Sequence, residues 1–408
     1  MVNIALLGYG TIGSGVYEVL ETNKESIAKR AGDSINVKYI FDLRDFPGTP
    51  VENKIIHDIN IINNDPDIKI VIEVMGGVDP AYTFVKQALL NGKSAATSNK
   101  ALVAKHGAEL LKIARENNVN FLFEASVGGG IPIIRPLNSS FTADEILEIS
   151  GILNGTTNYM LTKMADEGME FEDVLKQAQD LGYAEKDPTA DVGGFDSSRK
   201  IAILTSLMCG QQVDFEDIYT EGITDITALD FKYAKVINKS IKLFATSKVT
   251  EKGIVSMVSP VMVAPDHPLY SVNDVLNGIY VNGNMLGDTL LTGSGAGKLP
   301  TAASVVADIV DIVKHFGRNI MVSWEETKLT LADRKDITHS FFVRVKGKIN
   351  DKIEVIEKTF GKVIYIDAPG AEDEFAFITE TMTEGEYESR ITNIPDVIKM
   401  IRIEEKND

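Results

Sequence analysis

Apolar residues in the first 124 positions alternate between short continuous runs and stretches with helical spacing. The runs predict buried strands at residues 4–7, 37–41, 68–75, 94–97 and 121–124. Between them, apolar residues recur about three or four positions apart, as Val16, Leu20 and Ile27 illustrate, which is typical of an amphipathic helix. Strands that alternate with helices predict a parallel α/β sheet of the Rossmann type, whose ligands bind beyond the carboxyl ends of the strands.

The middle of the chain predicts a mixed α+β domain. A strand is expected over 146–153, and Asn154–Asn158 follows it as a turn that can cap a helix or hold a polar substrate. Helical spacing marks three further segments, at 171–178, 201–207 and 302–313. The pattern from 231 to 266 is mostly strand-like, and Asn282–Gly287 is typical of a hairpin turn. We expect the helix at 302–313 to return to the nucleotide domain.

The C-terminal part shows a third pattern. Trp324–Asp336 is charged and is predicted to be a linker. After it, the pattern gives the order strand, helix, strand, strand, helix, strand, at 341–345, 353–360, 363–366, 375–379, 384–394 and 397–403. This βαββαβ order predicts a small ferredoxin-like domain.

A glycine motif follows the first predicted strand directly. Gly8, Gly10 and Gly13 fit the Gly-x-Gly-x-x-Gly dinucleotide fingerprint, with Thr11 and Ile12 between them. The first glycine permits a tight turn, the second lets a pyrophosphate approach the backbone, and the third allows the helix to pack closely on the strand. The phosphates then lie at the helix N-terminus. The strand before and the helix after favour a dinucleotide site over a glycine turn that binds nothing.

Candidate cofactor-binding residues also follow the other strands. Asp42 would bind the ribose 2′-hydroxyl of NAD, whereas Arg44 would bind the 2′-phosphate of NADP, so the pair leaves the cofactor preference open. Gly76, Thr97 and Lys100 lie at further strand ends. Lys100 begins a predicted helix, where positive charge is disfavoured, and this favours a functional role over that of a solvated lysine.

The segment Gly182–Lys200 is the main candidate for the reacting centre. It gathers Glu185, Asp187, Asp191, Asp196, Arg199 and Lys200 into one polar run. Asp196 can cap the helix predicted at 201–207, and residues four apart share a helix face, so Asp196 and Lys200 should project together. The carboxylate would favour the protonated lysine. The alternative is a solvated loop followed by a surface ion pair, but Pro188 and a glycine pair restrict a backbone that needs no fixed shape as a connector.

Composition narrows the classes of function. The 408-residue chain is 44% hydrophobic and 25% charged, which is typical of a globular protein with two or three domains. Its net charge of −18 disfavours nucleic acid and anionic membranes as partners, so small metabolites are expected. A single cysteine, Cys209, excludes a disulfide framework, and the five histidines lack paired metal spacing. With no apparent signal peptide or membrane span, a cytoplasmic location is expected.

An ordered series of motifs resembles that of the homoserine dehydrogenases. The motifs are Gly8–Gly13, Glu73–Gly77, Asn99–Lys100, Glu124–Pro132, Gly151–Asn158, Gly182–Lys200, and Gly293–Gly297 with Pro300–Ala302. The match runs from about residue 1 to about residue 322 in the family's own order, which is more specific than any single motif. The resemblance implies reversible reduction of L-aspartate 4-semialdehyde to L-homoserine by NADPH or NADH, on the route to threonine, methionine and isoleucine.

The resemblance also implies roles for individual residues. Lys200 would donate the proton to the aldehyde oxygen, with Lys100 as a second lysine at the reacting group. Glu185 and Asp196 would hold the amino and hydroxyl groups of the substrate, and Asp191 would support the lysines. Hydride delivered to an aldehyde carbon builds negative charge on oxygen, which a positioned lysine can both stabilise and protonate.

A monovalent cation, sodium, is a further implication of the resemblance. Backbone carbonyls around Val127, Gly129 and Ile131 would hold it, with Glu124 nearby. NADP is the expected cofactor, because the family commonly accepts it. Gly295 precedes the returning helix and is expected near the cofactor, although such a helix needs no ligand to justify its packing.

The C-terminal module resembles an ACT domain in size and position. That resemblance implies an effector amino acid such as threonine, but the usual ligand-reading glycine has no clear counterpart among Lys348–Asp351, so a purely dimerising role is the alternative. The expected parts are residues 1–130 for nucleotide binding, 131–300 for catalysis and dimerisation, 301–322 as the returning helix, 323–337 as the linker and 338–408 as the ACT-like domain. A homodimer or higher homo-oligomer is expected.

Two other functions compete with this interpretation. One is a different nicotinamide-dependent aldehyde or alcohol oxidoreductase, and the other is a non-catalytic amino-acid sensor built on a relic dehydrogenase. The intact set of Lys100, Glu185, Asp196 and Lys200 argues against the sensor. A thiohemiacetal mechanism is disfavoured because Cys209 follows apolar residues in a predicted helix.

Overall fold

The computed structural model describes residues 1–321 and 324–404 and divides into two compact units. The first unit comprises Met1–Glu145, Ala202–Phe215 and Gly293–Leu329, and the second comprises Ile146–Ile201, Glu216–Thr292 and the chain from Thr330 onward. These cuts differ from the five predicted parts, whose boundaries stay a prediction. Residues 322, 323 and 405–408, at the edges of the predicted returning helix, linker and ACT-like domain, lie outside the described residues.

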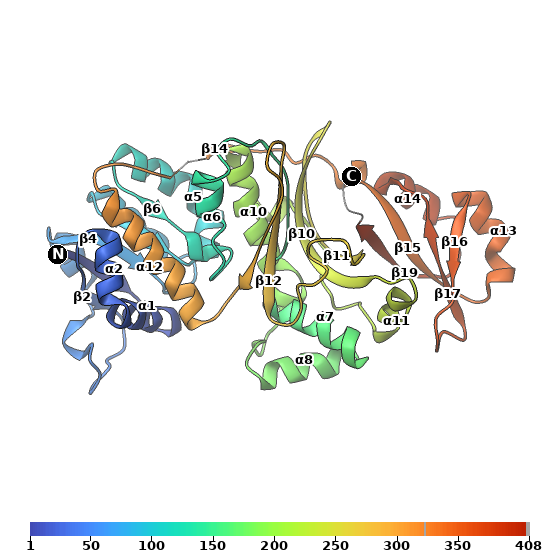
Figure 1. Ribbon diagram of the computed structural model, residues 1–408, viewed down its shortest axis with the longest axis horizontal. Coiled ribbons are helices and arrows are strands. Elements are labelled where there is room, and N and C mark those ends of the chain that lie inside the picture. Colours follow the sequence, from blue (N-terminus) through green and yellow to red (C-terminus); the bar gives the residue numbers. More distant parts are fainter. Residues whose placement is uncertain (322–323, 405–408) are drawn as a thin grey trace. The chain divides into compact units, whose positions relative to one another are not determined.

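A six-stranded parallel sheet forms the core of the first unit (Figure 1). Its strands are β1 (Val2–Leu7), β2 (Ile35–Phe41), β3 (Ile55–Ile56), β4 (Ile68–Glu73), β5 (Ser94–Thr97) and β6 (Phe121–Leu122). The order β3-β2-β1-β4-β5-β6, with parallel neighbours throughout, is that of a Rossmann domain, which confirms the nucleotide-binding part of the predicted fold. The buried residues of β1 and β4 are mainly Ile, Leu, Val and Ala, as expected for strands covered on both faces.

Helices connect these strands and cover the sheet. They are α1 (Thr11–Thr22), α2 (Lys24–Ala31), α3 (Ile59–Asn64), α4 (Ala81–Leu90) and α5 (Lys100–Glu116), with the short α6 (Ile134–Ser139) after the last strand. The predicted returning helix is α12 (Lys298–Lys314), and it lies beside α1 and α2 in Figure 1. Gly15 of α1 allows this approach, because a Cβ atom there would lie 3.1 Å from the Cβ of Ala302.

The first half of the predicted linker contains a strand. Residues 325–328 form β14 (Glu325–Lys328), which pairs with β8 (Gln211–Gln212). Trp324 is buried, donates a hydrogen bond of 2.9 Å from Nε1 to Gln212 Oε1, and lies so close to Gly107 of α5 that a Cβ there would be 2.4 Å from its ring. An aromatic anchor within a charged stretch thus fixes this segment to the first unit.

The second unit is built on a long sheet. Its strands β7 (Ile146–Ile152), β10 (Ser240–Thr250), β11 (Gly253–Val263), β12 (Leu276–Gly283) and β13 (Gly287–Ser294) follow the order β13-β12-β7-β10-β11. The hairpin predicted at Asn282–Gly287 joins β12 and β13, as expected. The helices of this unit are α7 (Gly155–Glu167), α8 (Phe171–Asp180), α9 (Thr189–Val192) and α11 (Ala228–Val236), and α10 (Phe195–Cys209) begins in it.

Two predicted details of this unit are wrong. Residues 231–236, predicted as part of a strand-like stretch, belong to α11, because Thr227 and Asp230 form a capping box and Phe231 and Tyr233 are buried by the helix. Helix α10 begins at Phe195 rather than near Ile201. Asp196 therefore lies in its first turn and is not a residue that caps the helix from outside.

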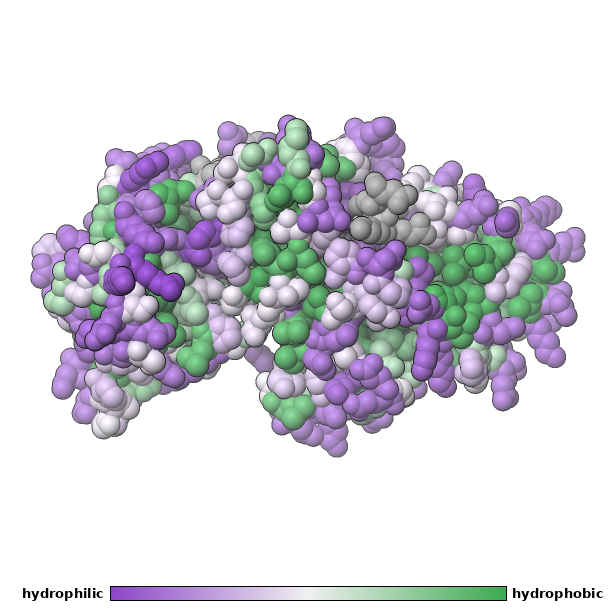
Figure 2. All heavy atoms as spheres, viewed as in Figure 1, coloured by the Kyte–Doolittle hydropathy of each residue, from purple (hydrophilic) through white to green (hydrophobic). Residues whose placement is uncertain are grey.

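The C-terminal residues have the predicted βαββαβ order. The elements are β15 (Thr338–Lys346), α13 (Ile349–Phe360), β16 (Val363–Ile366), β17 (Glu374–Thr379), the short β18 (Met382–Thr383), α14 (Glu384–Ile391) and β19 (Val397–Glu404). Antiparallel neighbours in the order β19-β15-β17-β16 give a ferredoxin-like sheet. Figure 2 shows a hydrophobic area over the strands of this C-terminal module, whose exposed large hydrophobic residues include Ile364 and Ile398.

The C-terminal module continues the sheet of the second unit. β19 pairs in parallel with β11, so Val261 lies opposite Arg402 and Val263 opposite Glu404. A buried cluster ties the module to α11, because Arg344 of β15 forms ion pairs of 2.7 Å with both Asp230 and Glu374. The C-terminal module and the rest of the second unit therefore share one continuous hydrogen-bonded sheet.

No helix among residues 1–321 and 324–404 has both the length and the hydropathy that crossing a membrane requires.

We expect that Arg344→Met destabilises the protein by about 3–5 kcal/mol, because it leaves the carboxylate of Asp230 buried without its cation. Guanidinium unfolding followed by circular dichroism measures this loss. Lys352→Met is the matched control, since its partner Asp396 is largely exposed and little change is expected. Equal shifts of the unfolding midpoint for the two variants would contradict the role assigned to Arg344.

Candidate active site

The glycine turn between β1 and α1 has the geometry of a phosphate-binding loop. Gly8 has a φ of +98°, which favours glycine, and Gly13 lies so close to it that a Cβ would be 2.1 Å from the Gly8 carbonyl oxygen. Gly10 is the N-cap of α1, and as a glycine it leaves the first N–H groups of the helix without a side-chain partner. The space where a Cβ atom would lie is open. Thr11 and Ile12 supply the first backbone N–H groups of the helix, which can therefore receive a phosphate.

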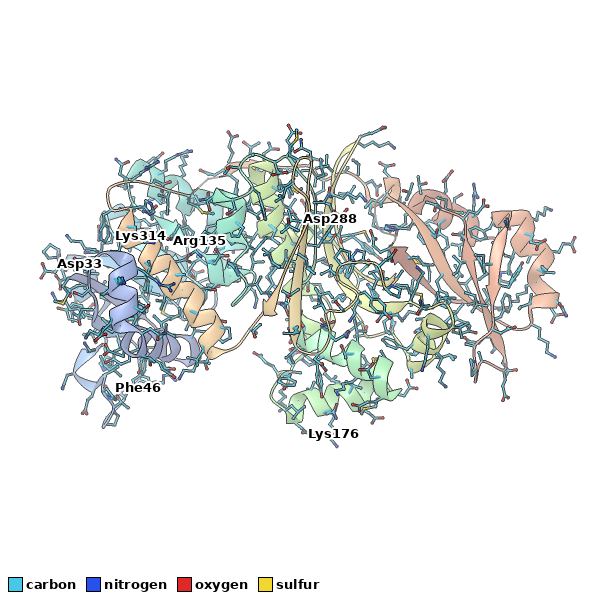
Figure 3. The ribbon with its side chains drawn as sticks, in the orientation of Figure 1. Asp33, Phe46, Arg135, Lys176, Asp288 and Lys314 are labelled. Atoms are coloured by element: carbon cyan, nitrogen blue, oxygen red, sulfur yellow. The ribbon has the colours of Figure 1, made fainter. Side chains whose placement is uncertain are left out.

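Asp42 and Arg44, which gave opposite indications of cofactor preference, bind each other at the end of β2. Arg44 donates from Nε and Nη2 to the two carboxylate oxygens of Asp42, each at 3.0 Å, and the backbone N–H of Tyr9 donates to Asp42 Oδ2 at 2.8 Å. Hydrogen bonding to Arg44 lowers the pKa of Asp42 to about 2. The guanidinium also lies over the ring of Phe46, which is labelled in Figure 3, at 5.2 Å from its centroid.

A buried carboxylate holds the loops after β4 and β5. Glu73 is fully buried, and its Oε1 accepts the backbone N–H of Met75 at 2.7 Å, while its Oε2 accepts the hydroxyl of Thr97 at 2.6 Å. Burial raises the pKa of Glu73. The side chain of Thr97 thus contacts Glu73, and Gly76, with a φ of +86°, follows the segment that Glu73 holds. Hydrogen bonds within the protein therefore position Thr97 and Gly76, two of the predicted cofactor-binding residues.

Asn99 joins the same loops to the start of α5. Its Nδ2 donates to Gly77 O at 2.5 Å, its backbone N–H donates to Thr97 Oγ1 at 2.9 Å, and its Oδ1 caps α5 by accepting the N–H of Leu102 at 3.1 Å. Lys100 is therefore the first residue of a firmly capped helix and is partly exposed.

Glu124 is a buried anchor of the first unit rather than an exposed acid. Its carboxylate accepts the backbone N–H groups of Ile133, Ile134 and Arg135 at 2.6–2.8 Å, at the start of α6. Arg135, labelled in Figure 3, also pairs with Asp308 at 2.8 Å, and burial raises the pKa of that carboxyl. This network connects the end of the parallel sheet to α12.

The segment predicted to hold a cation lies directly after Glu124. Val127, Gly129 and Ile131 are buried, and among the described residues no group donates a hydrogen bond to their carbonyl oxygens. Gly295 packs on this segment, since a Cβ at Gly129 would lie 2.3 Å from the Gly295 carbonyl oxygen. The described residues contain no cluster of three His, Cys, Asp or Glu side chains that could hold a metal ion. The groups that could coordinate a cation in this segment are therefore backbone carbonyl oxygens.

In the second unit, a buried lysine is held at the end of β7. Lys200 is 8% exposed, and its Nζ lies 2.8 Å from Asp196 Oδ2 and donates to Leu153 O at 2.7 Å. The predicted projection of Asp196 and Lys200 from one helix face is therefore confirmed. The pair is buried, which excludes the alternative of a surface ion pair.

Asn154 connects this pair to Asp191. As the N-cap of α7 it accepts the N–H of Thr157 through Oδ1 at 2.9 Å, and its Nδ2 donates to Asp191 at 2.8 Å and to Asp196 at 2.9 Å. The turn Asn154–Asn158 therefore caps a helix, which is one of its two predicted tasks, and the other, holding a polar substrate, stays a prediction. We call Asn154, Asp191, Asp196 and Lys200 the lysine cluster.

The structure does not bring every predicted residue into the lysine cluster. Glu185 is exposed, and its backbone carbonyl accepts a hydrogen bond of 3.0 Å from Gln179 Nε2. Cys209 lies at the end of α10, where burial raises the pKa of its thiol, as expected of a structural cysteine.

Family models and relatives agree with this geometry. The model of the homoserine dehydrogenase NAD-binding domain matches residues 8–124, and the homoserine dehydrogenase model matches residues 132–310. The homoserine dehydrogenase of Pseudomonas aeruginosa is 43% identical over 314 residues, which cover 77% of this chain and 72% of that protein. The chain belongs to the homoserine dehydrogenase family.

Solved structures of homoserine dehydrogenases share this fold over most or all of the chain. The enzyme from Thiobacillus denitrificans superposes with a TM-score of 0.88 at 33% identity and covers 99% of this chain and 98% of its own. A hyperthermophilic archaeal homoserine dehydrogenase in complex with NADPH gives a TM-score of 0.66 at 29% identity, over 76% of this chain and 97% of that one. This homoserine dehydrogenase is thus an oxidoreductase with a nicotinamide-nucleotide domain that interconverts L-aspartate 4-semialdehyde and L-homoserine, which rejects both competing functions.

Three residues of this homoserine dehydrogenase site were missed as site residues from the sequence. Asn154, Glu73 and Asn99 each bind two or more segments through side-chain hydrogen bonds. For Glu73 a signal existed, because an acidic residue at the end of an apolar strand must find partners when it is buried. For Asn154 the partners lie 37 and 42 residues further along the chain, beyond any local pattern.

We expect that Gly10→Ala keeps the thermal stability of the homoserine dehydrogenase but weakens nucleotide binding, because its methyl group enters open space where a pyrophosphate would approach. Gly13→Ala serves as the contrast and should lower the melting temperature, since its methyl group would meet the Gly8 carbonyl. Differential scanning fluorimetry and fluorescence titration with NADPH and NADH separate the two effects. Unchanged nucleotide affinity in Gly10→Ala would rule out the assigned phosphate position.

Proposed function

We propose that Lys200 is the group that exchanges a proton with the substrate oxygen. An ammonium group has three donors, and the described contacts of Lys200 Nζ use two of them, with Asp196 and with the Leu153 carbonyl. The third can point to a carbonyl oxygen of the substrate. This arrangement of a buried, oriented lysine is the observation that carries the proposal.

The bound nicotinamide supplies the hydride, and the protein supplies the charge that the transfer requires. As negative charge builds on the aldehyde oxygen, the ammonium of Lys200 stabilises it and then donates the proton that completes the hydroxyl group. Asp196 accepts a hydrogen bond from the lysine throughout and keeps its position. In the oxidation of homoserine, Lys200 takes the same proton back.

The remaining substrate contacts follow from the charges of the substrate. A zwitterionic amino acid needs an acidic partner for its ammonium group, and the exposed carboxylate of Glu185 and the acids of the lysine cluster are the candidates in this segment. Asp191 supports Asp196 through Asn154. Lys100, at the start of α5, is proposed as the second lysine at the reacting group.

NADP is the proposed cofactor, with Arg44 as the reader of the 2′-phosphate. Its side chain is 63% exposed, and Asp42 uses its Nε and Nη2 but not its Nη1 group. A guanidinium held by Asp42 and Phe46 can present that remaining edge to a phosphate. Gly8, Gly10, Thr11, Ile12 and Gly13 would hold the pyrophosphate. Gly76, Thr97 and Gly295 would border the nicotinamide half, Thr97 through its backbone because its hydroxyl binds Glu73.

A sodium ion is proposed at Val127, Gly129 and Ile131. Their buried carbonyl oxygens without hydrogen-bond donors fit a cation that binds oxygen, and Glu124 adds negative charge behind them. Such an ion would fix the turn on which Gly295 packs. Its role is structural, and no step of the reaction needs it.

Regulation and assembly complete the proposal. Gly347, with a φ of +106°, lies at the turn between β15 and α13, directly before the stretch Lys348–Asp351 that lacks the usual ligand-reading glycine. Gly347 supports an ACT-like domain that binds an effector amino acid such as threonine. A homodimer or higher homo-oligomer is supported by the exposed Leu276 and Leu290 on β12 and β13, at the edge of the long sheet. The proposed location is the cytoplasm.

For Lys200→Ala we predict a fall in kcat of about 100- to 10,000-fold with unchanged nucleotide affinity, because the variant loses its proton donor but not its nucleotide site. Homoserine oxidation and fluorescence titration measure the two quantities. Lys186→Ala, an exposed lysine in the same segment, is the matched control and should keep its kcat. A wild-type kcat in Lys200→Ala would reject the assigned role.

Arg44→Ala should raise the KM for NADPH by about 10- to 100-fold and leave the KM for NADH nearly unchanged, because only NADP carries the phosphate. Steady-state kinetics with both nucleotides tests this. Arg30→Ala, an exposed arginine on α2, should change neither value. Equal increases for the two nucleotides would show that Arg44 supports the loop rather than the phosphate.

A further inference from the structure

A histidine closes the turn after β2 in the first unit. His57 directly follows β3, and its Nδ1 lies 2.7 Å from the backbone carbonyl oxygen of Asp42, while its Nε2 lies 3.0 Å from Asp45 Oδ1. The turn between these two acids carries Arg44, which the Asp42 carboxylate binds. The ring of His57 therefore bridges the backbone on both sides of the arginine that is proposed to bind the 2′-phosphate of NADP.

Both ring nitrogens of His57 face acceptors. A carbonyl oxygen and a carboxylate can only accept, so both contacts are hydrogen bonds only when each nitrogen carries a hydrogen, as in the charged imidazolium. The neutral ring would turn a lone pair toward one of the two oxygens. The hydrogen bond to the Asp42 carbonyl, and then the one to Asp45, accordingly raises the pKa of His57 above its ordinary value.

Protonation of His57 decides the net charge of this turn. Two acids, Asp45 and Asp42, attract the charged ring, and Arg44 is the base that pairs with Asp42. Charged side chains of the neighbouring segment have hydrogen bonds of their own, and they are Glu52 and Lys54 before β3 and Asp58 after it. While His57 is charged, two bases balance two acids. Once His57 is neutral, the negative charge of Asp45 has no counterpart.

We propose that the charge of His57 makes the preference of this homoserine dehydrogenase for NADP over NAD depend on pH. The inference rests on the proposed position of the 2′-phosphate at Arg44. A charged His57 neutralises Asp45, so the field of Arg44 at the phosphate is attractive. With a neutral His57, the carboxylate of Asp45, one residue from Arg44, repels the phosphate. The 2′-hydroxyl of NAD carries no charge and is affected much less.

The preference for NADP should fall, rather than rise, with pH. Because the pKa of His57 is raised, the charged ring persists above about pH 6.5, and the advantage of NADP is lost as pH rises through that pKa. The 2′-phosphate loses its last proton at about pH 6, as phosphate monoesters do, and this strengthens NADP binding at higher pH. The two titrations act in opposite directions, so a fall identifies the histidine.

Fluorescence titration of the full-length protein with NADPH and NADH, from about pH 6.5 to about pH 9, tests this through the ratio of the two dissociation constants. In the wild type, the preference for NADPH should fall about threefold to fivefold, a modest effect because the side chains of His57 and Asp45 are 52% and 80% exposed. His57→Lys stays charged across this range and should keep the preference. His57→Gln is uncharged and should show the weaker preference at every pH.

Two further variants separate the charge of the ion pair from the shape of the turn. Asp45→Asn removes the acidic partner of His57, so the fall should occur at lower pH. Both partners are exposed, and Asp45→Asn carries the test if the His57 variants fail to fold. His315→Gln is the matched control, since its Nδ1 lies 2.8 Å from the Asp311 carbonyl oxygen, and it should show the wild-type fall.

NMR titration of the histidine rings measures the same coupling from the other side. If charged His57 favours NADPH, then bound NADPH must raise the pKa of His57, whereas NADH should leave it nearly unchanged. His57→Gln identifies the signal among those of the five histidines. A purely structural histidine would respond equally to the two nucleotides.

Four results would each overturn the proposal. They are no fall in the wild type relative to His57→Gln, the wild-type fall in His57→Lys, an unchanged midpoint in Asp45→Asn, and an equal pKa change of His57 with both nucleotides. Arg44→Ala distinguishes this failure from failure of the proposed phosphate site. If that variant weakens NADPH binding selectively, any of these results rejects the role of His57 alone.

Discussion

Keeping an ammonium group charged while it is buried is the constraint that organises the second unit. A lysine that is 8% exposed retains its charge only if nearby oxygens replace water, and Asp196 and the carbonyl of Leu153 do so at 2.8 and 2.7 Å. These partners come from the end of β7 and the first turn of α10. The strand, the cap of α7 at Asn154 and the start of α10 must therefore lie in fixed positions. The glycine pair before α10 is held in place by Gly222, which lies between α10 and α11 and packs against the Val192 carbonyl with no space for a side chain.

The first unit solves a similar problem with the opposite charge. Glu73 and Glu124 are buried carboxylates at the ends of strands, and each is held by backbone N–H groups of the loop that follows. Burial raises the pKa of both, and the N–H groups oppose that rise. Loops fixed in this way place Gly76 and the segment from Val127 to Ile131 without relying on a ligand. The active site is thus held largely by the protein's own hydrogen bonds.

Local sequence patterns predicted the parts of the fold that depend on local physics. The Rossmann sheet followed from apolar runs and the glycine turn, and the pairing of Asp196 with Lys200 followed from their spacing of four residues. Local patterns did not predict the positions whose structure depends on contacts with residues far away in the sequence. Trp324 is anchored by Gln212, and Asn154 is bound to residues in a later loop, so neither position carries a local signal. The start of α11 was missed because its capping box competes with a strand-like apolar pattern.

The continuity between β11 and β19 limits how the C-terminal module can influence catalysis. A module joined by a flexible linker could rotate freely, but here the backbones of Val261–Val263 and Arg402–Glu404 are paired, and Arg344 and Arg402 are buried in ion pairs that bridge the junction. Rotation would break these bonds and leave charges buried without partners, at a cost of several kcal/mol for each. Small shifts along the shared sheet preserve them. Any signal from the module to the lysine cluster should therefore travel as a displacement of β19 and Glu221, rather than as the swing of a separate domain.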